Sequence, residues 1–338
     1  MTDIEVRKNL KDYNTFGVAV EAKYFVEVEN ETKLNELVSD AVFLSNNHLV
    51  IGNGSNILFT NDFNGLVIKS AIEGIEVECE DDDSVYLKVG SGVEWNQVIE
   101  YALQNGYYGI ENLIDIPGDC GGAVVQNIGA YGVEIGNYVC KVRAFRLSSP
   151  YDFIELSNKE CRFGYRQSVF KSDSFTNNYL ITYVILRLSK HFVPNFQYSG
   201  VEQAVGDKES VTARDVAEAI SNIRKDKLPD VKEIGSAGSF FKNPVVEYLK
   251  YKDIIEKYNL KVYPVTAVEC KLSAAQMIEI AGYKGKRDGD VGVYDKHSLI
   301  VCNYGNATGE EIYQFALQIV EKVNYMFNLT LNSEVIIW

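Results

Sequence analysis

The stretch Ala237-Gly-Ser-Phe-Phe-Lys-Asn-Pro244 is the one around which the chain is organised. Ser239 lies between a glycine and two phenylalanines, and a lysine and an asparagine follow directly. This pattern predicts a hydroxyl in a partly dry pocket, where it transfers a proton if neighbouring groups take up the charge. The alternative is a Gly-Ser turn before a buried Phe-Phe strand, because glycine and serine are common turn residues. Other unusual stretches along the chain favour the first interpretation.

The composition indicates a globular protein with more than one domain. A chain of 338 residues is long for a single hydrophobic core. Hydrophobic residues make up 46% and charged residues 24%, as in ordinary soluble proteins. The net charge of −14 argues against nucleic-acid binding, because phosphates repel an acidic surface.

The N-terminus and the cysteines predict a cytoplasmic protein without a metal site. The first residues are polar and acidic, unlike a signal peptide. No apolar run approaches the roughly 20 residues of a membrane span. The 6 cysteines are scattered without a Cys-x-x-Cys pair, which favours reduced thiols over disulfides or zinc ligands.

A glycine-rich loop follows the first part of the chain, between two apolar runs that read as strands. It consists of Gly52, Asn53, Gly54, Ser55 and Asn56. Its glycines let the backbone approach an anion, and its serine and asparagine add donors, so the loop is a candidate phosphate cradle. It is neither a Rossmann fingerprint nor a P-loop, because the third glycine and the Gly-Lys-Ser/Thr triplet are missing. A plain hairpin turn is the alternative.

The segment from Ile116 to Gly132, with the sequence IPGDCGGAVVQNIGAYG, is dense in small residues and carries no helix or strand pattern. Missing side chains allow backbone amides to approach a flat or charged ligand. Gln126 and Asn127 each donate and accept hydrogen bonds, which suits the edge of a heterocycle.

Three further stretches carry candidate functional residues. Arg162 and Arg166 lie among aromatic residues, and buried arginines need an anionic partner such as a carboxylate, a phosphate or a developing enolate. An internal salt bridge is the alternative. Tyr198 is expected to be exposed in a loop. Glu334 is the one charge in an apolar strand near the C-terminus, and buried carboxylates are uncommon unless paired or functional.

The ends of several helices are predicted from capping residues. A helix from Trp95 is expected to stop at Gly106, and an acidic hairpin tip is expected at Glu80–Asp83. A hairpin is also expected from residues 290–302. The expected N-terminal caps are Asn30, Thr212, Ser273 and Thr308.

Taken together and in unbroken order, these motifs resemble the UDP-N-acetylenolpyruvoylglucosamine reductase (MurB) family. The resemblance implies an α+β protein: a two-subdomain FAD-binding fold of the PCMH/vanillyl-alcohol-oxidase type and a C-terminal α+β substrate-binding domain. The implied boundaries are residues 1–70, 71–205 and 206–338, with the C-terminal strand returning toward the active site. The motifs that carry the resemblance are Asn14–Gly17, Gly52–Asn56, Ile116–Gly118, Gln126–Gly132, Cys161–Arg166, Lys227–Asp230, Gly238–Pro244 and Ser333–Val335.

The resemblance also implies an activity in peptidoglycan precursor synthesis. NADPH would reduce noncovalently bound FAD, which would reduce UDP-N-acetylglucosamine enolpyruvate to UDP-N-acetylmuramate. The protein would be a cytoplasmic monomer. Its Tyr198 loop, together with the long segment between Pro244 and Ser273, resembles the subtype that folds a tyrosine loop over the substrate.

The implied roles extend to individual residues. Ser239 corresponds to the proton donor, and Arg166 and Glu334 correspond to the pair that polarises the enolpyruvyl carboxylate. Tyr198, Lys227 and Asn243 match positions that hold the UDP-sugar, and no metal is implied. The Gly52–Asn56 loop resembles the FAD diphosphate cradle, and the implied flavin walls are Ile116, Pro117, Gly118, Gln126, Asn127, Gly129, Ala130 and Tyr131.

Two departures from the family pattern and two alternative functions stand beside this assignment. Asp119–Val125 is less usual than the family's small apolar run, and no glutamine stands near Lys296-His297. An FAD oxidase of the same fold, acting on an alcohol or sugar, would turn over with oxygen and not use NADPH. A non-catalytic nucleotide-sugar binding protein would not need Ser239, Arg166 and Glu334 together.

Overall fold

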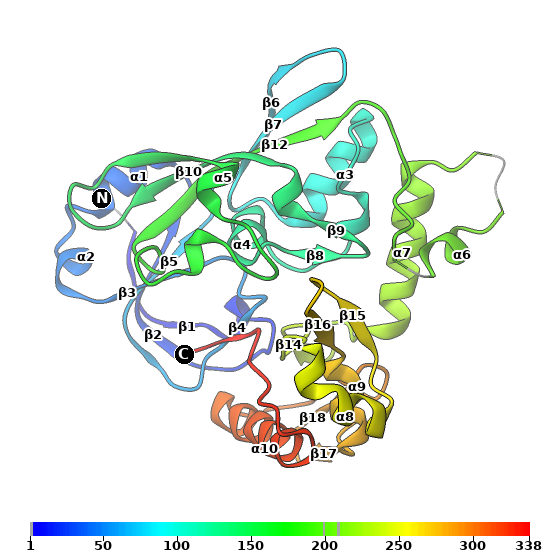
Figure 1. The fold of residues 1–338 in the computed structure, drawn as a ribbon. Helices are drawn as coiled ribbons and strands as arrows, with labels where there is room; N and C mark the ends of the chain where they lie inside the picture. The colour runs from blue at the N-terminus through cyan, green and yellow to red at the C-terminus, as the bar shows by residue number, and fades with distance from the viewer. Residues whose placement is uncertain (1–2, 199, 208–209) are drawn as a thin grey trace. The chain divides into compact units, whose positions relative to one another are not determined.

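The computed structural model describes residues 3–198, 200–207 and 210–338. The chain forms two compact units, each discontinuous in sequence. Unit 1 comprises residues 1–8, 21–53 and 63–224, and unit 2 comprises residues 9–20, 54–62 and 225–338. Both units mix helices with strands, as the sequence predicts (Figure 1). The finer boundaries at residues 70 and 205 stay a prediction.

The first sheet of unit 1 contains parallel strands joined by two short helices. Strand β5 pairs in parallel with both β2 and β3. Asn30 caps α1, its side chain accepting from the Lys33 amide, as predicted. The sheet order is β1 (Glu5–Asn9), β2 (Glu21–Val28), β5 (Phe63–Ser70) and β3 (His48–Ile51), and the helices are α1 (Glu31–Leu37) and α2 (Ala41–Ser45).

The second sheet of unit 1 is antiparallel throughout its registered pairs. Trp95 begins helix α3, is fully buried and belongs to the core, and Gly106 ends the helix with φ 72°, so both predictions are confirmed. The sheet order is β11 (Phe153–Ser157), β10 (Val139–Arg146), β12 (Tyr179–Ser189), β7 (Ser84–Gly90) and β6 (Ile75–Glu80). The helices are α3 (Trp95–Asn105), α4 (Cys120–Gln126), α5 (Asn158–Cys161), α6 (Val201–Val205) and α7 (Ala213–Lys227).

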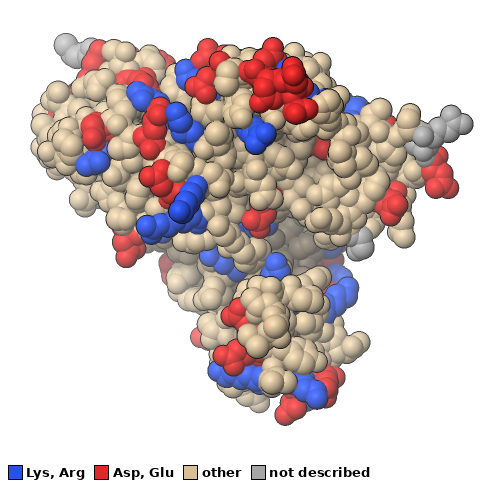
Figure 2. Space-filling view, turned by 45° about the horizontal axis from the view of Figure 1, so that its top comes forward, with Lys and Arg blue, Asp and Glu red and all other residues tan. Residues whose placement is uncertain are grey.

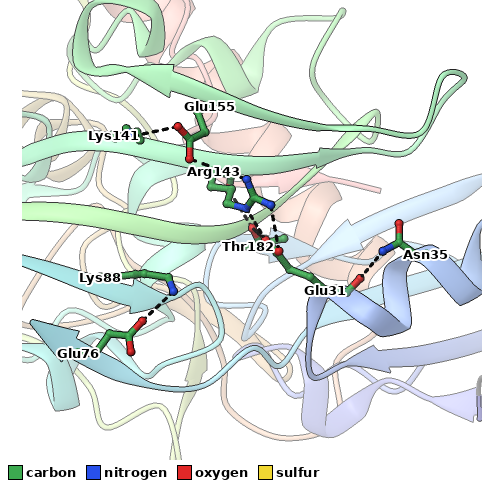
Figure 3. Close-up of polar contacts among 8 residues, drawn as sticks. All are labelled: Glu31, Asn35, Glu76, Lys88, Lys141, Arg143, Glu155 and Thr182. Atoms are coloured by element: carbon green, nitrogen blue, oxygen red, sulfur yellow. Dashed lines mark hydrogen bonds and ion pairs between the residues drawn. The ribbon is translucent and has the colours of Figure 1, made fainter. Parts of the chain in front are cut away.

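A polar network ties helix α1 to the antiparallel sheet of unit 1 (Figure 3). The Glu31 carboxylate accepts hydrogen bonds from Arg143 Nε at 2.7 Å and from Thr182 Oγ1 at 2.8 Å. Burial works to raise the pKa of Glu31, but these hydrogen bonds outweigh it and lower the pKa. Because α1 belongs with the parallel sheet, this carboxylate joins the two sheets of unit 1 through side chains rather than strand pairing.

Unit 2 is built on small antiparallel sheets covered by helices. Strands β18 and β19 pair as the predicted hairpin, and Thr308 forms the predicted capping box with Glu311 at the start of α10. Ser273 caps α9 as predicted. The strand order of the first sheet is β13 (Gly235–Ser236), β19 (Val301–Asn303), β18 (Val291–Val293) and β17 (Arg287–Asp288). The strand order of the second sheet is β14 (Val245–Glu247), β16 (Glu269–Leu272) and β15 (Val262–Pro264). The helices are α8 (Tyr248–Tyr258), α9 (Ala274–Ile280) and α10 (Gly309–Phe327).

Two segments from early in the sequence complete unit 2. The Asn14 side chain bonds the backbone of Leu10 and Val18, which closes the loop of residues 10–18. The carbonyl of Phe16 accepts from the Asn303 side chain at 2.9 Å. Strand β4 (Ile57–Leu58) pairs in parallel with β20 (Ile336–Ile337). Residues 9–20 and 54–62 therefore share a fold with the C-terminal third of the chain.

The surface carries charges of both signs. Figure 2 shows acidic side chains gathered at the top of that view and blue side chains interspersed below. The tip of the β6–β7 hairpin, residues 80–83, is exposed as predicted. No helix in the described part of the chain is long and apolar enough to cross a membrane.

Candidate active site

Ser239 lies in an irregular, half-buried segment of unit 2. Gly238 has φ 67°, a left-handed conformation that suits glycine, and it turns the chain into Ser239. Phe240 and Phe241, which follow, are 1% and 2% exposed. Within the described residues, the Ser239 hydroxyl has no hydrogen-bond partner. The Ser239 hydroxyl therefore lies next to two buried phenylalanines, and within the described residues it donates its proton to no acceptor.

The segment after Ser239 runs antiparallel to the segment that carries Glu334. The Glu334 amide donates to the Phe240 carbonyl at 2.8 Å, and Phe241 forms a backbone bridge with Ser333. Unit 2 thus brings Ser239 and Glu334, 95 positions apart in number, to either side of Phe240. The expectation that Glu334 lies in a buried apolar strand is wrong: it is half-buried in a bend, because the regular strand begins only at Ile336.

Asn56 and Asn243 anchor the neighbouring backbone in unit 2. The Asn56 side chain donates to the Glu334 carbonyl at 3.2 Å, and its own carbonyl accepts from the Ile336 amide at 3.0 Å. Asn243 accepts from the Ala274 amide at 2.9 Å, at the start of α9. Asn56 therefore ties the glycine-rich loop to the Glu334 segment, and Asn243 ties the segment after Ser239 to the start of α9.

His297 is a candidate ligand-binding residue. The sequence drew attention to it only because the glutamine of the family pattern is missing near Lys296-His297. Burial, and then the charge of Lys227, lower the pKa of His297. Its turn reaches the Ser239 segment, since the Phe240 amide donates to the Leu299 carbonyl at 2.8 Å. Lys227 itself is exposed at the end of α7. The basic neighbour suits a site for an anionic ligand.

The second half of the glycine-rich loop presents backbone donors. Within the described residues, the N–H groups of Gly54, Ser55 and Asn56 have no protein acceptor. Successive unpaired N–H groups form a concave anion site, so this segment fits a diphosphate. Gly54 has φ 64°, and a Cβ there would overlap the Tyr13 carbonyl, so the glycine is required by the protein's own packing as well.

The glycine-rich stretch of unit 1 contains a helix that its sequence does not reveal. Residues Cys120–Gln126 form α4, which Asp119 caps by accepting from the Gly122 amide at 2.7 Å. The prediction of an irregular segment is wrong here. Gly121 lies so close to Ser91 that a Cβ would come within 2.9 Å of it, so the small residues serve helix packing. Before α4, the Gly118 carbonyl accepts from the Trp95 amide at 3.0 Å.

The amide of Asn127 does not face a ligand, contrary to the sequence expectation. Asn127 is fully buried, and its Nδ2 donates to Glu134 at 2.9 Å and to the Gly164 carbonyl at 2.8 Å. Its Oδ1 accepts from the Gly136 amide at 2.9 Å. Any contact of this residue with a flavin must therefore come from its backbone. The side-chain Oε1 of Gln126 accepts a hydrogen bond from Lys171 Nζ at 2.6 Å.

Of the two predicted arginines, only Arg166 is enclosed. Arg162 is exposed at the end of α5, so its expected burial is wrong. Arg166 is half-buried with φ 53°, and its Nη2 donates to the Gly129 carbonyl at 2.7 Å. This bond brings Arg166 to the strand β8 (Gly129–Ala130), among the predicted flavin walls.

Tyr131 and Tyr198 pack together in unit 1 beside an arginine that the sequence did not single out. The two rings meet edge to face with centroids 5.1 Å apart, and Tyr198 is 46% exposed, as predicted. Arg224 hydrogen-bonds Tyr131 and donates to the Asp115 carbonyl at 2.9 Å. Burial lowers the pKa of Arg224.

Comparisons with known proteins agree with this geometry. A family model described as "FAD binding domain" matches residues 22–147, and one described as "UDP-N-acetylenolpyruvoylglucosamine reductase, C-terminal domain" matches residues 229–338. A UDP-N-acetylenolpyruvoylglucosamine reductase from Chromobacterium violaceum is 39% identical over 97% of both chains. Another, from Amoebophilus asiaticus, is 40% identical over 98% of both chains.

A solved structure shares the fold. The UDP-N-acetylenolpyruvylglucosamine reductase from Thermus caldophilus superposes with a TM-score of 0.69 at 24% identity, covering 100% of both chains. The similarity therefore extends over the FAD-binding part and the C-terminal part together, and not over one domain alone.

Proposed function

The chain belongs to the UDP-N-acetylenolpyruvoylglucosamine reductase family, and we propose that it uses NADPH to reduce UDP-N-acetylglucosamine enolpyruvate to UDP-N-acetylmuramate. It is an oxidoreductase of peptidoglycan precursor synthesis with an FAD-binding domain. The finer features are proposals that rest on the resemblance: noncovalent FAD, the tyrosine-loop subtype, a cytoplasmic monomer and domain limits at residues 70 and 205.

The observation that carries the proposal is the antiparallel pairing of Phe240 and Phe241, which follow Ser239, with the segment that contains Glu334. When bound, FAD would supply the hydride transfer. Hydride addition to the terminal methylene of the enolpyruvyl group leaves negative charge on the adjacent carbon and its carboxylate. Ser239 then donates its proton to that carbon, while Arg166 and Glu334 polarise the carboxylate. A hydroxyl that makes no hydrogen bond within the described residues and lies beside buried phenylalanines suits the role of proton donor.

The remaining residues have binding roles in the proposal. The Gly52–Asn56 loop holds the FAD diphosphate with the unpaired N–H groups of its second half. Residues 116–118 and 126–131 form the flavin walls, with Asn127 acting through its backbone. Tyr198, Lys227 and Asn243 hold the UDP-sugar.

Purified protein is expected to be yellow with noncovalent FAD. Acid precipitation should release the chromophore into the supernatant, because nothing in the proposal ties the flavin covalently. The preparation should then oxidise NADPH only when UDP-N-acetylglucosamine enolpyruvate is added. A colourless protein that fails to take up FAD would refute the proposal, and oxygen-driven turnover of an alcohol or sugar without NADPH would favour an oxidase.

Tyr198→Phe is expected to weaken substrate binding by roughly tenfold to a hundredfold, the usual cost of losing a hydrogen bond to a charged group. The ring contact with Tyr131 remains, so reduction of the flavin by NADPH should stay close to wild type. Stopped-flow absorbance of each half-reaction measures both effects. Tyr325→Phe, at a residue 85% exposed, is the control and should change neither. Equal losses in both half-reactions would assign Tyr198 a structural role.

A further inference from the structure

Asn112 is a buried asparagine in the short 3-10 helix η2 (Glu111–Leu113) of unit 1. Its side-chain Nδ2 donates to the Tyr131 carbonyl at 2.9 Å and to the Asn195 carbonyl at 3.1 Å. Both partners can only accept, so they fix the orientation of the amide. The Oδ1 atom is buried and has no hydrogen-bond partner within the described residues. A buried oxygen in this state is costly, which suggests that the two donated bonds serve a purpose.

The two carbonyls belong to segments of unit 1 that face each other. Tyr131 lies in the turn that follows β8 and has φ 50°, a left-handed conformation that is unfavourable for tyrosine. A Cβ on Gly132, the next residue, would lie 3.2 Å from the Cβ of Gln197. The Tyr198 ring packs edge to face on the Tyr131 ring. Asn112 therefore bonds to both sides of the contact that holds Tyr198.

The bond to Asn195 also fixes a segment that has few other polar ties. Within the described residues, the backbone of residues 193–198 makes two further hydrogen bonds, and both are local. The Gln197 amide donates to Asn195 Oδ1 at 3.0 Å, and the Tyr198 carbonyl accepts from the Val201 amide at 3.4 Å. Fixing the backbone at Asn195 reduces the conformational freedom that Tyr198 loses when a ligand binds.

We propose that Asn112 positions Tyr198 for the substrate by tying the Asn195 backbone to the turn at Tyr131. The inference rests on the proposed function, in which Tyr198 holds the UDP-sugar. Asn112 is 1% exposed and Tyr198 is 46% exposed, so the asparagine acts on a ligand through the tyrosine. A tyrosine segment that is ordered before binding loses less entropy on binding, and this difference strengthens the affinity for the substrate.

Asn112→Leu keeps a side chain of similar size and removes both donated hydrogen bonds. The dissociation constant of UDP-N-acetylglucosamine enolpyruvate is expected to rise roughly threefold to tenfold, which corresponds to the net value of one hydrogen bond. The change of flavin absorbance on titration of the oxidised enzyme measures this constant. Flavin reduction by NADPH should stay close to wild type, because Tyr131 keeps its hydrogen bond to Arg224.

A double-mutant cycle with Tyr198→Phe separates positioning from a general structural role. If Asn112 acts through Tyr198, then Asn112→Leu should weaken substrate binding less in the Tyr198→Phe background than in the wild type. Limited proteolysis gives a second measurement that does not depend on activity. Chymotrypsin should cleave the ligand-free Asn112→Leu protein within residues 192–198 faster than the wild type, because the segment opens more often.

Asn158→Leu is the matched control in unit 1. Asn158 Nδ2 also donates to two carbonyls, those of Gly136 and Val139, each at 2.7 Å. Its replacement removes the same kind of bonds and should change neither the substrate dissociation constant nor cleavage within residues 192–198. If Asn112→Leu does not fold, Asn112→Ser retains one donor and should show the same changes to a smaller extent.

Two results would overturn the inference. One is unchanged substrate affinity in Asn112→Leu although Tyr198→Phe weakens binding. The other is equal weakening by Asn112→Leu in the wild-type and Tyr198→Phe backgrounds, which would make Asn112 a residue that acts independently of Tyr198. Normal substrate affinity in Tyr198→Phe would instead contradict the role that the proposed function gives to Tyr198.

Discussion

Ser239→Ala is expected to slow oxidation of the reduced enzyme by UDP-N-acetylglucosamine enolpyruvate by roughly 10²–10⁴-fold, the range typical of general acid catalysis. The substitution removes the hydroxyl that unit 2 holds beside Phe240 and Glu334, and no hydrogen bond within the described residues is lost with it. FAD binding and reduction by NADPH should therefore stay close to wild type. Stopped-flow absorbance separates the two half-reactions.

The controls for Ser239 use the same position and its neighbour. Ser239→Cys restores a donor of similar size and should recover part of the rate. A double-mutant cycle compares Ser239→Ala, Glu334→Gln and the variant that carries both. The loss of activation free energy in the double variant should be smaller than the sum of the losses in the two single variants, because both groups act on one transition state. If the alanine variant reoxidises at nearly the wild-type rate, Ser239 is only a turn residue.

Gly54→Ala is expected to lower the free energy of unfolding by roughly 2–5 kcal/mol. Gly54 has φ 64°, which costs a residue with a Cβ about 1–2 kcal/mol. The new Cβ would also overlap the Tyr13 carbonyl, and forced overpacking costs typically about 1–3 kcal/mol. Urea unfolding followed by tryptophan fluorescence measures the sum.

Gly282→Ala separates these two contributions. Gly282 has φ 82°, but a Cβ added there would meet nothing within 4 Å, so only the backbone cost of about 1–2 kcal/mol applies. Equal destabilisation by the two substitutions would mean that the Gly54 loop moves away from Tyr13, and that the close approach is not required for folding.

Local signals in the sequence predicted local structure well. Three residues cap helices as expected, because their side chains accept hydrogen bonds from free backbone amides of the first turn: Asn30, Ser273 and Thr308. Gly106 ends a helix as expected, because glycine adopts the left-handed conformation there. Helix α4 escaped prediction because its two glycines read as loop residues. The reason for Gly121 is contact with Ser91, thirty positions away, and no local pattern reports such a contact.

The catalytic roles of the site residues stay a prediction, and the sequence predicted their local conformation only in part. Motif resemblance placed Ser239 and Glu334, yet Glu334 was expected in a strand because its neighbours are apolar. The pairing of residues 240–242 with residues 332–334 decides its conformation instead. Asp119 was noticed as a departure, but its burial against Gly52 depends on tertiary packing that the sequence does not express.

The pairing of β4 with β20 sets an order for folding during synthesis on the ribosome. Asn56 and Glu334, which bond beside this pairing, are 278 positions apart. At about 5–20 residues per second, the ribosome needs tens of seconds to make the partner strand after β4 has emerged. During that interval strand β20, which pairs with β4, has not yet been made. Three apolar residues that are buried in the folded unit therefore lack this strand: Ile57, Leu58 and Phe59. Ile57 and Leu58 can enter the β4–β20 pairing only after the C-terminal strand has been made, and closure of this long loop slows the folding of unit 2.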